Sequence, residues 1–143
     1  MGVLNAMVSN KNLAPDLVRV LPFMRRPELA ALFQRAGAIV SPSLTDGTPN
    51  SMLEAMACGA LPVMSRLESI AEWITHGKNG LLFDANDVFQ LTDCLRQALD
   101  SSSLRKQAQE INYALVRKKA DCERGMPSAR EFLKGIKHYE WPK

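Results

Sequence analysis

Residues 38–64 read AIVSPSLTDGTPNSMLEAMACGALPVM and place two apolar runs around a polar loop and a helical stretch. The first run, 38–40, ends at Ser41-Pro42, and the second covers 61–64. The turn residues between them precede a predicted helix over 50–58 that stops at Gly59. A strand, a loop, a helix and a second strand in this order predict one unit of a parallel sheet.

The same unit repeats on both sides of this stretch. Apolar runs predict further strands over 17–21 and 81–83, and helical spacing predicts helices over 27–36, 69–74 and 87–99. Strands that are almost continuously apolar and alternate with helices are typical of a parallel sheet covered on both faces. We therefore expect an α/β fold with a sheet of about four strands. Past residue 101 only helices are predicted, over 102–120 and 127–138.

The composition is that of a globular domain and excludes several classes of protein. With 143 residues, 46% hydrophobic and 23% charged, the chain is neither disordered nor collagen-like, and no apolar run is long enough to cross a membrane. Three cysteines without a CxxC pair predict neither a zinc site nor a disulfide framework. The first fifteen residues lack a leader pattern, so a cytoplasmic location is expected.

Basic charge is concentrated in the last forty residues. Residues 104–143 hold ten Lys or Arg against five Asp or Glu. Because acidic residues interrupt the basic ones, we interpret this segment as a solvated helix face rather than a surface for nucleic acid or membrane.

The loop after residue 40 is the candidate site, because ligands bind at the carboxyl ends of parallel strands. It supplies a carboxylate from Asp46, a glycine that permits close backbone approach at Gly47, and polar residues before a helix N-terminus, where a diphosphate is favoured electrostatically. Ser51 and Glu54 also have the spacing of a helix-capping box, which Ser69 and Glu72 repeat. Spacing alone leaves both interpretations open.

The stretch 41–83, with DGTPNSMLEAMACGALPV followed by GLLF, resembles the C-terminal lobe of family 4 retaining glycosyltransferases of the GT-B fold. In that family a carboxylate, seven residues and Glu-Ala-Met-Ala-x-Gly-x-Pro-Val form the donor signature. Asp46 and Glu54 have this separation. The likeness extends more loosely from about residue 18 to about residue 99. It implies a partial Rossmann-like donor-binding domain over 1–100, with its core at 17–99, and a helical C-terminal extension over 101–143.

The resemblance also implies roles for particular residues. Glu54 would bind the ribose hydroxyls of a nucleoside-diphosphate sugar, and Asp46 would lie near the transferred sugar, so these two carboxylates are the expected catalytic pair. The expected donor-binding residues are Gly47, Thr48, Pro49, Asn50, Ser51 and Glu54. No metal or other cofactor is implied. The chain departs from the family at Asp46, where glutamate is commonest, and at Glu68-Ser69, where many members have Gly-Gly.

The function that follows is the donor-binding lobe of a retaining hexosyltransferase. A family enzyme also has an amino-terminal acceptor lobe of similar size, for which 143 residues leave no room, so we expect an incomplete enzyme whose other lobe is a separate chain or has been removed. Two alternatives stay open. One is a non-catalytic module that binds nucleotide-sugars, and the other is an interaction domain that pairs with a protein, itself included, through the exposed cleft face.

Other conspicuous residues are given structural roles. Arg25-Arg26 follow a predicted strand and could approach phosphate, but a solvated helix start is the simpler interpretation. Met56 and Cys58 are expected to pack, because no basic neighbour in the sequence activates the thiol. Trp73 and Trp141 are likewise expected to pack.

Overall fold

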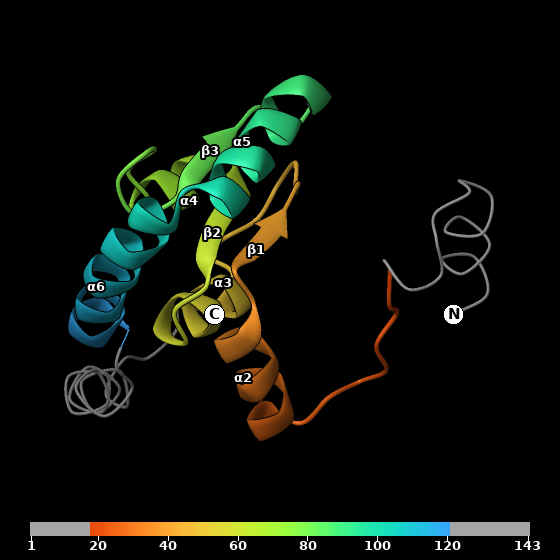
Figure 1. Cartoon of the computed structure of the whole chain (residues 1–143), viewed down its shortest axis with the longest axis vertical. Coiled ribbons are helices and arrows are strands. Elements are labelled where there is room, and N and C mark those ends of the chain that lie inside the picture. The colour runs from red at the N-terminus through yellow and green to blue at the C-terminus, as the bar shows by residue number, and fades with distance from the viewer. Residues whose placement is uncertain (1–17, 121–143) are drawn as a thin grey trace, which may run out of the picture.

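The computed structural model describes residues 18–120, and Figure 1 shows their arrangement. Three parallel strands in the order β1-β2-β3 form one sheet with helices on both faces, which confirms the predicted α/β class. The elements in chain order are α2 (Arg26–Arg35), β1 (Ala38–Ser41), α3 (Asn50–Ala57), β2 (Leu61–Ser65), α4 (Glu68–Ala71), β3 (Leu81–Phe83), α5 (Val88–Asp100) and α6 (Ser102–Lys119).

The central strand β2 is buried along its whole length, as its continuous apolar sequence requires. Ala38 of β1 lies opposite Leu61, and Leu81 of β3 lies opposite Val63. Side chains alternate between the two faces of the sheet, so each face has its own apolar cluster.

One cluster packs α5 and the first half of α6 against the sheet, and we call it the α5-side cluster. The α3-side cluster lies on the opposite face, under α3 and α4. The α5-side cluster contains Leu61, Val63, Leu81, Phe83, Cys94, Ala98, Leu104 and Ala108, and the α3-side cluster contains Met52, Met56, Met64, Ile70, Ile74 and Leu82.

The prediction of a strand over 17–21 is wrong for the residues that the structure describes. Residues 18–21 form no strand, and the sheet has three strands rather than about four. Val18 and Leu21 are 37% and 41% exposed, so the run buries little apolar surface. An apolar run becomes a strand only where a neighbour supplies hydrogen bonds and burial, and these residues have neither. Residue 17 lies outside the described residues.

The helix predicted over 69–74 is shorter in the structure, and an asparagine side chain bonds the residues that follow it. α4 ends at Ala71, and the following residues are tied by Asn79. Asn79 accepts a hydrogen bond from the Thr75 amide at 2.7 Å and donates one to the Trp73 carbonyl at 2.9 Å. The helix predicted over 127–138 lies outside the described residues.

Helix α6 packs against both apolar clusters and does not stand apart from the sheet. Leu104 and Ala108 are buried in the α5-side cluster, and Leu115 and Val116 pack on the α3-side cluster. Asn112, fully buried, exchanges two hydrogen bonds with Asn79 of the loop before β3. The proposed domain boundary at residues 100 and 101 stays a prediction. No helix within residues 18–120 has the length and hydrophobicity to span a membrane.

Candidate functional site

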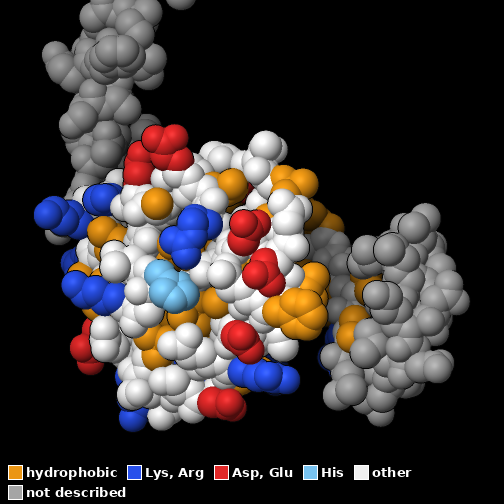
Figure 2. Space-filling model, turned by 90° about the horizontal axis from the view of Figure 1, so that it is seen from above, with side chains coloured by type: hydrophobic (Ala, Val, Ile, Leu, Met, Phe, Trp, Pro, Cys, Tyr) orange, Lys and Arg blue, Asp and Glu red, His pale blue; other side chains and the backbone are white. Residues whose placement is uncertain are grey.

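The loop between β1 and α3, residues 42–49, lies at the end of the sheet towards which the strands run, at the top of Figure 1. Figure 2 looks down on this end and shows acidic and basic side chains on the same face, with hydrophobic ones reaching the surface among them. The candidate loop therefore has the position that the sequence predicts for it.

Three hydrogen bonds hold this loop against the elements that follow it. Ser65, at the end of β2, donates to the Ser43 carbonyl. Ser69 Oγ of α4 donates to the Asp46 carbonyl at 3.0 Å. Trp73 Nε1, just after α4, donates to Thr48 Oγ1 at 3.2 Å. The loop is thus fastened at its start and on both sides of Gly47.

Asp46 and Gly47 lie in an exposed stretch of the loop, which begins at Leu44. The Asp46 side chain is exposed, because only the backbone of this residue is held. A Cβ added at Gly47 would meet no atom within 4 Å, and the backbone there is outside the left-handed region that favours glycine. Nothing within the described part of the chain therefore requires glycine at this position.

The helix-capping interpretation of Ser51 and Glu54 is wrong. The N-cap of α3 is Pro49, with φ −69°, and Ser51 is already the second residue inside the helix. A proline with this φ is compatible with a helix start, so the helix begins earlier than the serine suggests. No hydrogen bond or ion pair within residues 18–120 uses the Glu54 carboxylate, which is half-buried on α3.

The second predicted capping box is also wrong. The N-cap of α4 is Leu67, and the Ser69 hydroxyl reaches the Asp46 carbonyl instead of a helix amide. At the start of α2 the Arg25 amide donates to the Glu28 carboxylate at 2.9 Å, which is one half of a capping box, and the Arg25 side chain accepts no bond in return. The side chains of these two residues also form an exposed ion pair, which agrees with a solvated helix start.

Two adjoining pockets flank Glu54, and Arg26 lines both. The first, of about 230 Å³, lies between α2 and α3 and is otherwise lined by Ala30, Phe33, Ala57 and Cys58. The second, of about 340 Å³, lies between α3 and the end of α6 and is otherwise lined by Asn50, Leu53, Ala57, Val116 and Ala120.

These pockets combine one carboxylate and one guanidinium with apolar walls. A carboxylate accepts two hydrogen bonds from a vicinal diol, a guanidinium binds phosphate, and an apolar wall covers a flat ring. Of the predicted site residues, the structure brings Asn50 and Glu54 together here. Asp46, Gly47, Thr48, Pro49 and Ser51 are not among the residues that line these two pockets.

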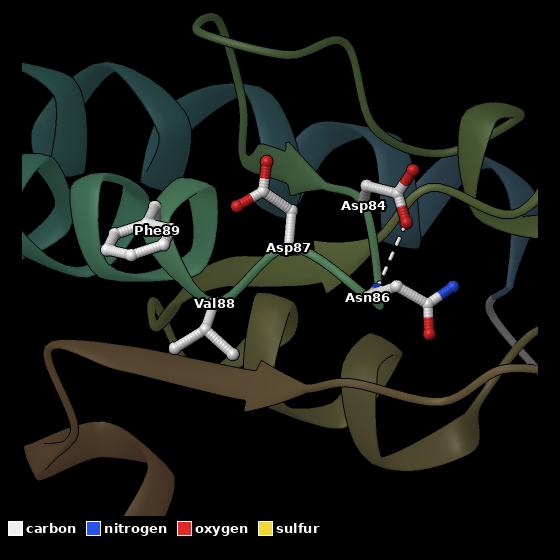
Figure 3. Close-up of a pocket in the computed structure, with 5 residues that line it drawn as sticks. All are labelled: Asp84, Asn86, Asp87, Val88 and Phe89. Carbon is white, nitrogen blue, oxygen red and sulfur yellow. Dashed lines mark hydrogen bonds between the residues drawn. The ribbon is translucent and has the colours of Figure 1, made fainter.

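A third hollow, of about 380 Å³, lies at the loop after β3 and is shown in Figure 3. Its two carboxylates accept hydrogen bonds from nearby backbone amides. Asp84 Oδ1 accepts from the Asn86 amide at 3.0 Å, and Asp87 Oδ1 caps α5 by accepting from the Gln90 amide at 2.9 Å. Across residues 18–120 no group of three or more His, Cys, Asp or Glu side chains is arranged to hold a metal ion.

The two cysteines within the described residues differ in environment. Cys58 is half-buried at the wall of the first pocket, whereas Cys94 is buried in the α5-side cluster. Burial raises the pKa of the Cys94 thiol, the Asp93 charge raises it further, and Arg66 opposes both. Met56 is fully buried, as expected for a packing residue.

Comparison with known proteins gives the family. The sequence profile described as "Glycosyl transferases group 1" matches residues 5–115. The chain belongs to this glycosyltransferase family. Over 90 residues this glycosyltransferase chain is 36% identical to D-inositol 3-phosphate glycosyltransferase of Pseudarthrobacter chlorophenolicus. The match covers 63% of the chain and 21% of that protein, so the chain spans about a fifth of the length of its relative.

Solved structures agree on the fold. Sucrose-phosphate synthase from Thermosynechococcus elongatus superimposes with a TM-score of 0.85 at 20% identity, over 93% of this chain and 33% of that one. HepE from Anabaena, in complex with UDP-glucose, superimposes with a TM-score of 0.82 at 18% identity, over 94% of this chain and 36% of that one. This group 1 glycosyltransferase chain therefore has the fold of the C-terminal lobe of a GT-B enzyme.

Two residues that touch the loop were not identified from the sequence. Ser69 was interpreted as a helix cap and Trp73 as a packing residue, and Trp73 does pack on the α3-side cluster. Their bonds to the loop join residues 23 and 25 positions apart, which no local pattern reveals. The one available signal was the departure of Glu68-Ser69 from the Gly-Gly of many family members.

Proposed function

We propose that this chain is the donor-binding lobe of a retaining glycosyltransferase, which transfers a hexose from a nucleoside-diphosphate sugar to an acceptor hydroxyl. The observation that carries the proposal is the position of Glu54. Its carboxylate is half-buried, is used by no helix cap, and lies at the wall shared by two adjoining pockets. Family membership and the likeness to a fold solved with UDP-glucose support the same function.

In this proposal Glu54 accepts hydrogen bonds from the ribose hydroxyls, and Arg26 approaches the phosphates from the facing helix. The pairing suits the chemistry, because a carboxylate needs hydroxyl donors and a guanidinium needs an anion. Backbone amides of the loop between Gly47 and Ser51 face the diphosphate or the sugar, and the Asp46 carboxylate lies near the sugar. No metal is required for these contacts.

Transfer breaks the bond between the anomeric carbon and the diphosphate oxygen, and the electron pair leaves with the diphosphate. This lobe stabilises the charge that grows on that leaving group. The acceptor hydroxyl passes its proton to an oxygen of the departing diphosphate and bonds to the anomeric carbon on the face that the diphosphate leaves, so the configuration is retained. We propose that the acceptor is delivered by a second lobe and that this lobe alone binds donor without completing transfer.

The test is titration calorimetry of UDP, GDP and ADP, and of their hexose conjugates, against the chain. We expect one base to bind and the binding to be lost in Glu54→Ala. Glu110→Ala is the matched control, because Glu110 is an exposed glutamate on α6 away from both pockets. If no nucleotide binds at millimolar concentration while the chain is folded, the proposal is wrong.

Cys58 offers an independent readout of the same site, since it lines the first pocket with Glu54. A bound nucleotide would cover this thiol. We expect the nucleotide that binds in calorimetry to slow modification of Cys58 in a Cys122→Ser background, and to have no such effect when Glu54→Ala is added. Equal labelling rates with and without that nucleotide would place it elsewhere on the chain.

A further inference from the structure

We propose that Ser69 and Trp73 are positioning residues that hold the donor loop in its binding conformation. This inference rests on the proposed function. Ser69 lies on α4 and donates to Asp46, and Trp73 lies just after α4 and donates to Thr48. Asp46 and Thr48 are the residues on either side of Gly47. We call these two hydrogen bonds the loop clamp.

The loop clamp holds the backbone carbonyl of Asp46 and the side-chain hydroxyl of Thr48, and it leaves the Asp46 carboxylate exposed. Ser69 uses the Asp46 carbonyl, so the carboxylate of Asp46 stays in solvent. Gly47, between the two fixed residues, has open space around it. A loop fastened in this way has less conformational entropy to lose when a ligand binds, and this preorganisation increases affinity.

The indole of Trp73 is itself held from two sides. It packs against the α3-side cluster, and the ammonium group of Lys119 lies 5.4 Å from the centre of its ring. Lys119 Nζ also donates to the Glu72 carbonyl at 3.3 Å. Because the ring is fixed by the core and by the end of α6, its N–H is directed at Thr48 independently of the loop.

The loop clamp depends on the hydroxyl of Ser69, which an alanine or glycine at this position would lack. The serine at this position gives α4 a direct bond to the loop that precedes it by 23 residues. The exposed Asp46 is thus attached to α4 through its own carbonyl.

The test separates a positioning role from a structural one by removing one hydrogen bond at a time. Trp73→Phe keeps an aromatic ring but loses the N–H, Thr48→Val removes the acceptor at nearly constant volume, and Ser69→Ala removes the second bond. Ser102→Ala is the control, since Ser102 is an exposed serine at the start of α6. Nucleotide affinity is measured by calorimetry, and loop order by amide hydrogen exchange of residues 47, 48 and 50, since Pro49 has no amide hydrogen.

We expect Trp73→Phe and Ser69→Ala each to weaken nucleotide binding about fivefold, the factor that one ordinary hydrogen bond supplies. Loop amides should exchange faster in both variants, while Ser102→Ala matches the unsubstituted chain. In the Thr48→Val background, Trp73→Phe should cause no further loss, because both changes remove the same bond. Thr48→Val tests that bond independently if Trp73→Phe folds poorly.

Two results would show that the inference about the loop clamp is wrong while the proposed function still holds. One is an unchanged affinity in Ser69→Ala and Trp73→Phe while Glu54→Ala abolishes binding. The other is a full additive loss when Trp73→Phe is combined with Thr48→Val, which would mean that Trp73 acts by another route. If the unsubstituted chain binds no nucleotide, the proposed function fails and the role of the loop clamp in donor binding fails with it.

Discussion

At the scale of single residues, substitutions at two glycines test ligand binding and folding stability separately. Gly47 has open space where a side chain would begin, whereas a Cβ at Gly80 would lie 2.8 Å from Ile74 Cγ2 and 2.9 Å from the Pro62 carbonyl oxygen. The same substitution, Gly to Ala, therefore probes two different properties of the molecule.

We expect Gly47→Ala to leave the thermal unfolding midpoint unchanged and to weaken nucleotide binding about tenfold or more, because the added methyl would stand where the proposed ligand approaches the backbone. Calorimetry and thermal unfolding of the same sample measure both effects. Unchanged affinity would show that the donor does not come close to this residue.

Gly80→Ala should act in the opposite way. The added methyl has contacts at 2.8 Å in a buried site, so overpacking should lower the free energy of unfolding by about 1–3 kcal/mol. Chemical denaturation checks this value. A variant as stable as the unsubstituted chain would mean that β2 and the residues before β3 can move apart at little cost.

Cys94 gives a prediction about the reactivity of a buried thiol. Its pKa is raised from 9.0, first by burial and then by the neighbouring Asp93 charge, so at a given pH the folded chain holds less thiolate than the unfolded chain. With Cys58 and Cys122 changed to serine, we expect Cys94 to react with a disulfide reagent at pH 8 no faster than the chain unfolds. Rapid labelling under native conditions would contradict the buried placement.

At the scale of elements, the Asn79 and Asn112 pair fastens α6 to the loop before β3. Asn79 Nδ2 donates to Asn112 Oδ1 at 2.8 Å, and Asn112 Nδ2 donates to the Asn79 carbonyl at 2.9 Å. Both residues are buried, and no buried polar side-chain atom among the described residues lacks a partner. The pair is the polar centre of a largely apolar contact.

Asn112→Ala should lower the free energy of unfolding by about 2–4 kcal/mol, because it removes both bonds and leaves the polar groups of Asn79 buried without them. Urea denaturation of this variant and of the exposed neighbour Glu110→Ala measures the difference. Equal stability of the two variants would show that water replaces the lost partner.

The elements that sequence patterns predicted correctly are those whose apolar residues meet a partner nearby. Strands at 38–41, 61–65 and 81–83 and the helices between them follow from their runs and spacing. The run at 17–21 has the same appearance, but in its described part no neighbouring strand pairs with it. Pairing is a property of the fold, so local composition could not decide this case.

The candidate site was predictable in part for the same reason. The place of the loop after β1 follows from the order of strands and helices. The capping interpretation of Ser51 failed because Pro49 starts the helix two residues earlier. The hydrogen bonds from Ser69 and Trp73 could not be predicted from the sequence, because each forms only when the fold places the loop beside α4.

At the scale of the whole molecule, α6 belongs to the folded unit that holds the site. It contributes Leu104 and Ala108 to one apolar cluster, packs on the other, and carries Asn112 and Lys119 to their partners on the far side of the sheet. The two faces of the sheet are thus joined through one helix.

A chain ended at residue 101 should therefore lose cooperative unfolding. Removal of α6 uncovers both clusters and breaks the contact with Trp73 together with the Asn79 pair. Circular dichroism followed through a urea titration is the measurement, with the 143-residue chain as reference. A sharp transition in the shortened chain would support the helical extension as a separate part.

The burial of the Asn79 side chain also affects the rate of its deamidation. Asn79 is followed by Gly80, and an asparagine before glycine is prone to attack by the next backbone nitrogen, which converts its amide to a carboxylate. In the folded chain that amide is held by the Thr75 amide, the Trp73 carbonyl and Asn112. Deamidation there must wait for local opening, and the new buried charge would then hinder closing. Storage conditions that favour opening would gradually convert the chain into a form that refolds poorly.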